Sequence, residues 1–251
     1  MFDDISQHAF QPEEGTLRSY QGKTLSKQSS GVEIAKQYGS PYLVIHRADL
    51  LNCLVAKAKE MGVEIKFGAV VSSIDFEKGS INLLSGEEVA GDVIFGADGE
   101  RSASRDALLG RPDIPHGTGD TVYRVAVKAS SVRNQESLSQ FLKTPSVNLW
   151  LGPDSHTVSY ILKRQDILNI VLVCEDTANE EVMYGPQPAD IHELKEMFKD
   201  WDPAFAALLQ AENLMCMKWS LLEIDEVENW CNPAGKFALI GDAAHAMLPY
   251  L

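Results

Sequence analysis

The chain has 251 residues, of which 45% are hydrophobic and 23% charged, and its formal net charge is -14 with a pI of about 4.8. This composition is typical of a folded protein with one or two domains, and the strong negative charge disfavours nucleic acid or an anionic membrane as a partner. No apolar run approaches the roughly 18 residues that cross a membrane, and the acidic start Met1–Asp4 lacks the apolar segment of a signal peptide. We therefore expect a soluble, cytoplasmic protein.

The cysteines predict neither a metal site nor a disulfide framework. No pair has C-x-x-C spacing, and none has a histidine nearby at the spacing of metal ligands. A chain of this length needs no disulfide bonds to stabilise its core. We therefore expect buried, reduced thiols at Cys53, Cys174, Cys216 and Cys231.

The first 40 residues are polar and weakly patterned, and a clear helix signal follows them. Apolar residues from Leu50 to Met61 recur at helical spacing, and Gly62 stands where a helix C-cap is common. The turn Glu77–Gly79 separates two β-like runs and indicates a hairpin. An apolar run covers residues 42–45, and strands are predicted over residues 63–67, 70–76, 80–84 and 92–95.

From about Pro112 the pattern changes to β-like runs separated by turns, which predicts a sheet of mostly antiparallel strands. Two helices and a last strand follow, with Asp190 and Asp202 at plausible helix starts. The runs are residues 123–127, 147–151, 157–162 and 168–173, the helices 191–198 and 204–209, and the last strand 236–240.

Two junctions share one pattern, in which a buried strand ends at glycine and an aspartate and small residues open a helix. They are Gly96–Gly99 and Gly241–Ala244. Dinucleotides bind outside the carboxyl ends of parallel strands, where small residues let the backbone come close. An aspartate at this point can accept hydrogen bonds from ribityl or ribose hydroxyls. Either junction alone is equally typical of a tight turn with a capped helix; together they favour a dinucleotide site.

With these junctions, the chain resembles class A flavoprotein monooxygenases of the salicylate-hydroxylase-like and para-hydroxybenzoate-hydroxylase-like kind. The resemblance covers nearly the whole chain, and the third of its motifs is the most specific. The runs that carry it are His46–Leu50, Gly96–Arg105 and Gly241–Pro249.

The resemblance implies an α/β fold: an FAD/NAD(P)-binding Rossmann-like domain with an inserted, mostly antiparallel β-sheet substrate domain. It places the FAD-binding domain at residues 1–111 and 236–251 and the substrate domain at 112–235. It implies that FAD is reduced by NAD(P)H and that a flavin hydroperoxide hydroxylates a small aromatic substrate. No catalytic side chain and no metal site is assigned. The implied cofactor-binding residues are Arg47, Asp98, Gly99, Gly241, Asp242, Ala243 and Ala244.

Members of this family begin with a βαβ unit that carries a G-x-G-x-x-G motif, and this motif is missing here. The segment most similar to it is Gly117–Gly119. We therefore expect an incomplete chain that lacks the first βαβ unit and the last helices, and that alone binds FAD weakly or not at all.

Two alternatives remain. One is another flavin-dependent oxidoreductase on the same scaffold, although the Trp-x-Trp-x-x-Ile element of halogenases is absent. The other is a non-catalytic remnant or binding module.

Among single residues, we expect Arg105 to be a helix-surface charge and His245 to be structural. Tyr123, Arg124 and Trp150 could line a substrate pocket, but aromatic residues in strands usually belong to the core.

Overall fold

The computed structural model contains two compact units, and each is described by itself. The first unit consists of Met1–Val63 and Asp120–Trp219, and the second of Glu64–Gly119 and Ser220–Leu251. The domain boundaries at residues 111 and 235 stay a prediction. The structure describes residues 1–29, 31–133, 136–162, 167–176, 181–212 and 214–249.

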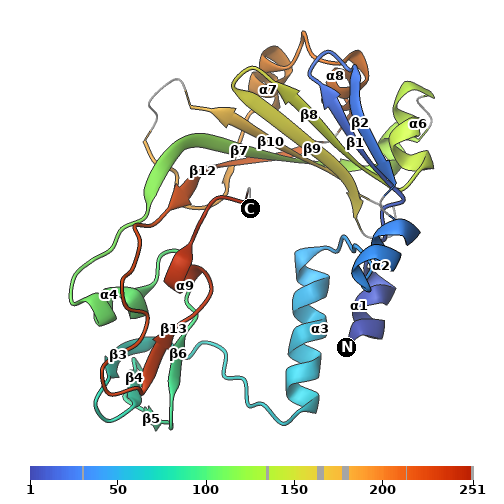
Figure 1. Cartoon of the computed structure of the whole chain (residues 1–251). Helices are drawn as coiled ribbons and strands as arrows, with labels where there is room; N and C mark the ends of the chain where they lie inside the picture. The colour runs from blue at the N-terminus through green and yellow to red at the C-terminus, as the bar shows by residue number, and fades with distance from the viewer. Residues whose placement is uncertain (30, 134–135, 163–166, 177–180, 213, 250–251) are drawn as a thin grey trace. The chain divides into compact units, whose positions relative to one another are not determined.

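An eight-stranded sheet forms the centre of the first unit (Figure 1). Its strands are β1 (Glu14–Ser19), β2 (Thr24–Ser29), β7 (His116–Lys128), β8 (Ser146–Gly152), β9 (Ser155–Leu162), β10 (Ile167–Glu175), β11 (Gln187–Pro188) and β12 (Met215–Glu223). Their order is β11-β12-β7-β10-β9-β8-β1-β2. The pairs β7–β10, β10–β9, β9–β8, β1–β2 and β11–β12 are antiparallel, and β1 and β8 are parallel. The predicted, mostly antiparallel sheet is confirmed.

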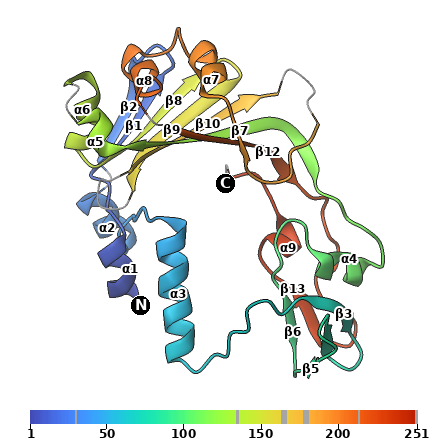
Figure 2. The ribbon, with the colours of Figure 1, turned by 180° about the vertical axis from the view of Figure 1, so that it is seen from behind.

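Helices of the first unit cover one face of this sheet. In both ribbon views α6 (Glu136–Lys143), α7 (Ile191–Met197) and α8 (Pro203–Leu208) lie on the same side of the strands (Figures 1 and 2). Tyr123 and Trp150 point to this side and belong to the buried core, so the core interpretation of these two aromatic residues is confirmed. The remaining helices of this unit are α1 (Phe2–His8), α2 (Val32–Tyr38), α3 (Arg47–Glu60) and α5 (Ala129–Val132).

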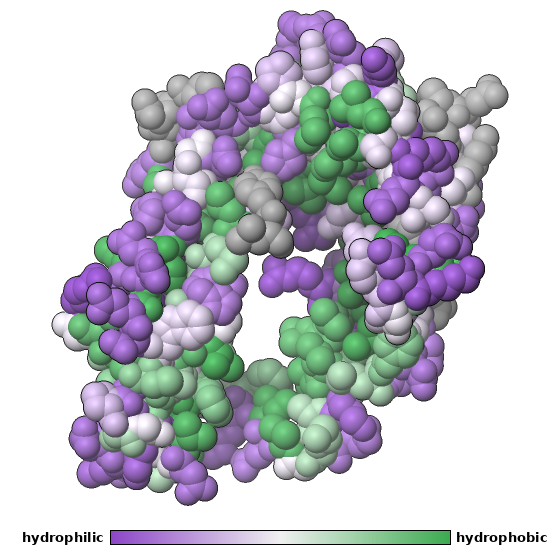
Figure 3. All heavy atoms as spheres, viewed as in Figure 1, coloured by the Kyte–Doolittle hydropathy of each residue, from purple (hydrophilic) through white to green (hydrophobic). Residues whose placement is uncertain are grey.

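The opposite face of the sheet is less buried. Strand side chains alternate between the two faces, and Val147, Val158 and Val171 on this face are only half-buried. Hydrophobic side chains are at the surface over the strands of this sheet (Figure 3). This face carries Arg124 and the buried side chain of Asn169.

The hairpin formed by β1 and β2 has no counterpart among the predicted strands. β2 is exposed along its whole length, so its sequence lacks the apolar alternation that marks a half-buried strand. Gly22, with a φ of 87°, forms the turn between the two strands.

The helix predicted from the apolar spacing of Leu50–Met61 is α3, which begins at Arg47. His46 caps it, since its Nδ1 accepts a hydrogen bond of 3.2 Å from the backbone N–H of Ala48. The strand predicted over residues 63–67 is wrong, because no strand pairs with this segment and its alternating pattern runs through an exposed connection. In the apolar run 42–45, Val44 forms an isolated antiparallel bridge with Phe10.

The second unit contains a three-stranded antiparallel sheet and a pair of parallel strands. The predicted hairpin turn at Glu77–Gly79 is confirmed, and Asp75 fixes it by accepting the backbone N–H groups of Glu77 and Lys78. The elements are β3 (Val71–Asp75), β4 (Ser80–Leu83), β5 (Glu88–Ala90), β6 (Ile94–Gly96), α4 (Ala103–Leu109), β13 (Phe237–Leu239) and α9 (Asp242–His245).

Candidate functional site

The two glycine–aspartate junctions lie side by side. β6 and β13 pair in parallel, with Phe237 opposite Ile94 and Leu239 opposite Gly96. The backbone N–H of Ile240 donates a hydrogen bond of 2.9 Å to the carbonyl oxygen of Gly96. Both strands therefore end at the same edge, which is where α/β proteins place ligands.

A small core fixes this pair of strands. Gly96 has no room for a side chain, because a Cβ atom there would lie 2.8 Å from the Cβ of Ser104 and 2.9 Å from the Cζ of Phe237. The first glycine thus serves close packing between β6, β13 and α4. The core consists of Phe237, Leu239, Ala243 and Ala244, with Ile74, Phe76, Ile94 and Leu108 packed against it.

The glycine of the second junction has a different role. Gly241 has a φ of 59° and a ψ of -143°, a conformation that side chains rarely adopt, and no atom lies within 4 Å of its missing Cβ. Gly99 also has a positive φ, of 84°, and open space in place of a Cβ. Both glycines therefore give sharp turns with an accessible backbone.

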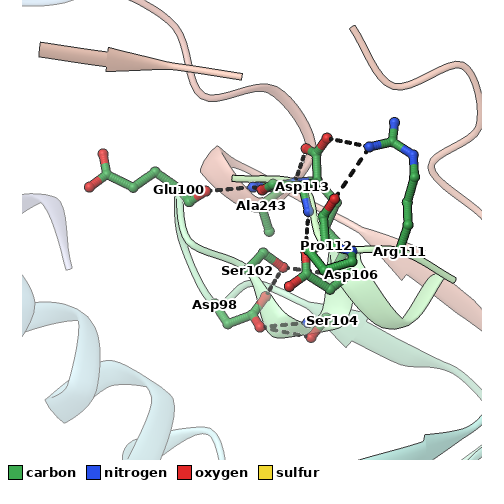
Figure 4. A network of polar contacts seen from close by, with 10 residues as sticks. Asp98, Glu100, Ser102, Ser104, Asp106, Arg111, Pro112, Asp113 and Ala243 are labelled. Atoms are coloured by element: carbon green, nitrogen blue, oxygen red, sulfur yellow. Dashed lines mark hydrogen bonds and ion pairs between the residues drawn. The ribbon is translucent and has the colours of Figure 1, made fainter. Parts of the chain in front are cut away.

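The carboxylate of Asp98 is used within the first junction (Figure 4). The Ser102 hydroxyl donates to one oxygen, and the backbone N–H and hydroxyl of Ser104 donate to the other at 2.9 and 3.0 Å. Burial alone would raise the pKa of Asp98, but these hydrogen bonds outweigh it and hold the pKa below its ordinary value. Asp98 thus fixes the loop that leads into α4.

Asp242 differs from Asp98 in that its carboxylate is exposed and makes no hydrogen bond or ion pair with any described residue. It lies at the first position of α9, directly after the open turn at Gly241. The second junction therefore presents a free hydrogen-bond acceptor beside accessible backbone.

The side chain of Arg105 makes hydrogen bonds with the backbone of both junction regions. Its side chain is fully buried, which contradicts the expected surface position. Its Nε pairs with the Asp113 carboxylate at 2.8 Å, and Nη1 donates to the carbonyl oxygen of Ala243 at 3.0 Å. Nη2 donates to the carbonyl oxygens of Glu100 and Asp113 at 2.6 and 3.1 Å. In the sequence, only its position three residues after Ser102 distinguishes it from other arginines.

Arg47, the remaining predicted site residue, belongs to the first unit. It is the first residue of α3, and its exposed side chain makes no hydrogen bond or ion pair with a described residue. The structure thus brings the six other predicted residues together at one edge, and places Arg47 at the start of a capped helix.

A cavity of about 490 Å³ lies beside β6 in the second unit. It is mostly apolar, and Asp98 and Ser104 contribute polar atoms to its wall. Small residues line much of it. The small lining residues are Ala69, Gly96, Ala97, Ala103 and Ala107.

The less buried face of the large sheet holds a second group of polar atoms. The Nε of Arg124 donates to the Oδ1 of Asn169 at 2.7 Å, while the buried Nδ2 of Asn169 has no partner in the part of the chain that the structure describes. Asn169 lies opposite Tyr160 in the sheet, and burial raises the pKa of Tyr160. A cavity of about 340 Å³ extends from Tyr160 along Tyr42, Leu43, Val44, Ile45, Val147 and Val158. No feature of the sequence distinguishes Asn169 from other strand residues.

Two further properties concern the described residues only. No group of three or more His, Cys, Asp or Glu side chains among them could hold a metal ion. None of their helices is long and apolar enough to span a membrane. All four cysteines are free; Cys174 and Cys216 are buried as expected, whereas Cys231 is exposed and Cys53 is half-buried.

Paired parallel strands that end in glycine–aspartate turns are typical of a dinucleotide-binding α/β protein, and the same chain also forms a large, mostly antiparallel sheet. Residues 6–251 match the family described as "FAD binding domain". The chain therefore belongs to this family, and the resemblance to class A FAD-dependent monooxygenases is confirmed.

Curated relatives agree with this assignment. The "FAD-dependent monooxygenase OpS4" of Beauveria bassiana is 34% identical over 259 residues, which cover all of this chain and 59% of the relative. The "3-hydroxybenzoate 6-hydroxylase 1" of Aquipseudomonas alcaligenes is 32% identical, over 90% of this chain and 56% of the relative. The chain thus spans somewhat more than half the length of these relatives.

Solved structures show the same fold. A structure of CtdE "in complex with FAD and substrate 4" covers 99% of this chain with a TM-score of 0.84 and 18% identity. A salicylate hydroxylase substrate complex covers 98% with a TM-score of 0.78 and 24% identity. This chain covers 61% and 62% of those two chains.

Proposed function

We propose that this chain is the flavin-binding and substrate-binding part of an FAD-dependent monooxygenase that hydroxylates a small aromatic compound. The observation that carries the proposal is the pairing of β6 and β13, which sets an accessible Gly241 and a free Asp242 carboxylate at the strand ends. Sugar-like hydroxyl groups need such an acceptor, and a close approach needs such a backbone. The second junction therefore fits FAD.

The predicted cofactor residues take different roles in this proposal. Asp242 accepts hydrogen bonds from the ribityl chain, while Gly241, Ala243 and Ala244 leave its approach free of bulky side chains. Asp98 and Gly99 shape the neighbouring loop, since the carboxylate of Asp98 is already hydrogen-bonded. Arg47 offers an exposed cation for the cofactor. Bound FAD would supply the redox chemistry, taking electrons from NAD(P)H and delivering one atom of oxygen to the substrate.

The less buried face of the large sheet has features that favour an aromatic, anionic substrate. Arg124 is held by Asn169, and its terminal nitrogens have no partner among the described residues. A guanidinium with free terminal nitrogens can bind a carboxylate or a phenolate. The neighbouring cavity provides an apolar wall for an aromatic ring. Three relatives are named as 3-hydroxybenzoate 6-hydroxylases, which agrees with this substrate class. The cytoplasmic location and the choice of NADH or NADPH stay predictions.

Product analysis tests the function directly. The purified chain is incubated under isotopically labelled oxygen with NADH or NADPH and with 3-hydroxybenzoate or salicylate. FAD is added in large excess, because this chain spans only part of its relatives and is expected to bind the cofactor weakly. We expect substrate-stimulated oxidation of the nicotinamide and one labelled oxygen atom in the aromatic product. A product without labelled oxygen would instead favour another flavin-dependent oxidoreductase. Binding of the aromatic acid without any turnover would favour a non-catalytic module.

A further inference from the structure

A buried arginine outside the predicted cofactor residues holds the turn that carries Asp242. α9 has only four residues, so its carbonyl groups lack partners within the helix. The carbonyl oxygen of Ala243, a residue that is 0% exposed, accepts its hydrogen bond from Arg105, which is also 0% exposed. Water is therefore in no position to replace this bond.

The other contacts of Arg105 make its position rigid. The planar guanidinium reaches Asp113, Glu100 and Ala243 at once, a pattern that matches its fixed fork of donors. Ser102, whose side chain accepts the backbone N–H of Arg105, also donates to Asp98. One connected network thus runs from the carboxylate of the first junction to the backbone of the second (Figure 4).

We propose that Arg105 is a positioning residue for the cofactor: by holding the Ala243 carbonyl, it fixes the Gly241–Ala244 turn and thereby aims the Asp242 carboxylate. Arg105 itself is buried and touches no ligand. This inference rests on the proposed FAD site, but the fixing of the turn is measurable without FAD.

Hydrogen exchange of backbone amides is the first test. The N–H groups of Ala244 and His245 both donate to the Gly241 carbonyl, so they report on the turn. In Arg105→Lys one ammonium cannot serve the three separated acceptors, and we expect these two amides to exchange about tenfold faster. The N–H groups of Ile94 and Ile240, which belong to the β6–β13 ladder, should keep their protection.

Arg111→Lys is the matched control. Arg111 also pairs with Asp113, at 3.3 Å, but its side chain is exposed and it makes no contact with Ala243. We expect unchanged exchange of the turn amides in this variant. Asp113→Asn, which keeps Arg105 and removes the charge it pairs with, gives a milder version of the same perturbation if Arg105→Lys does not fold.

Two exchange results would overturn the proposal. In the first, the turn amides of a folded Arg105→Lys or Asp113→Asn variant are as protected as in the wild type. In the second, the ladder amides lose protection as much as the turn, which would make Arg105 a general structural residue of the unit.

A double-mutant cycle with FAD then tests the link to Asp242. We expect Arg105→Lys to weaken FAD binding about fivefold or more in the wild-type background and to have no further effect in an Asp242→Asn background. Equal effects in both backgrounds would contradict the proposal, because Arg105 would then act independently of Asp242. If the wild type shows no FAD binding, the proposed function fails while the exchange result still decides the role of Arg105.

Discussion

The guanidinium of Arg105 donates a hydrogen bond of 3.0 Å to the backbone carbonyl oxygen of Ala243, 138 residues further along the chain. The helix after the first glycine–aspartate junction thereby holds the helix after the second. Asp98 stabilises the start of the first helix, which leaves Asp242 as the carboxylate with free acceptor positions. Two junctions that are alike in sequence thus differ in structure: the carboxylate of Asp98 is hydrogen-bonded within its own loop, and that of Asp242 has no partner among the described residues.

Because Gly96 is closely packed, we expect one added methyl group at this position to lower the free energy of unfolding. Gly96→Ala places a Cβ 2.8 Å from the Cβ of Ser104, and we expect a loss of about 1–3 kcal/mol in the free energy of unfolding, measured by urea denaturation. Gly91→Ala is the control in the same unit, since its Cβ would lie 3.4 Å from the Val93 carbonyl oxygen, an ordinary contact. That variant should stay within about 0.5 kcal/mol of the wild type. Equal stability of the two variants would contradict the packing described for β6.

The lowered pKa of Asp98 predicts a stability contribution that depends on pH. Since the pKa in the folded state lies below the ordinary value of 3.8, the contribution is complete above that value and disappears as the pH falls through the folded pKa. Asp98→Asn should therefore reduce the free energy of unfolding by a constant amount from about pH 7 to about pH 5, and by less at about pH 3. A difference between variant and wild type that stays the same at low pH would show that the charge of Asp98 does not matter.

The buried indole of Trp150 predicts a stability role for Asp202. One oxygen of Asp202 accepts the indole N–H at 2.9 Å, and the other caps α8 through the N–H of Ala204 at 3.0 Å. Asp202→Ala leaves a buried donor without a partner and removes a cap, so we expect a loss of about 2–4 kcal/mol in thermal or chemical unfolding. Asp202→Asn, which keeps one acceptor oxygen, should lose roughly half as much. An Asp202→Ala variant that is as stable to unfolding as the wild type would exclude this role.

Thiol reactivity should separate the four cysteines. Burial raises the pKa of Cys174 and of Cys216 to about 11, so at pH 8 almost none of either thiol is ionised. With an aromatic disulfide reagent at about pH 8, we expect Cys231 to react first and the two buried thiols only on unfolding. Mass spectrometry of the labelled peptides identifies the sites. Rapid labelling of Cys174 or Cys216 in the native protein would contradict their positions in the core.

The sequence predicts those elements whose signals are local. The helix that contains Leu50, the hairpin turn at Glu77–Gly79 and the strands before Gly96 and Gly241 are predicted correctly, because apolar spacing and turn residues determine them. The β1–β2 hairpin carries no such signal, since the exposed strand β2 has no apolar alternation. The strand over residues 63–67 fails for the opposite reason: its residues alternate, but no neighbouring strand pairs with them.

For the candidate site, the sequence predicts which residues end the two strands, but not how they differ. Nothing local distinguishes the hydrogen-bonded Asp98 from the free Asp242, because the difference depends on Ser102 and Ser104. The burial of Arg105 also cannot be predicted from the sequence, since its partner Ala243 is remote in the chain. Contacts over such separations follow from packing and leave no periodic signal in one sequence.

An NMR titration with FAD tests the central claim most directly, because it detects weak binding and locates it. In the wild type, FAD should shift the backbone amide signals of Gly241–Ala244. Asp242→Asn should reduce these shifts at equal FAD concentration, while the control Asp92→Asn, at another exposed carboxylate of the same unit, should not. Absence of any shift at Gly241–Ala244, or equal shifts with and without the Asp242 carboxylate, would contradict a flavin site at the ends of β6 and β13.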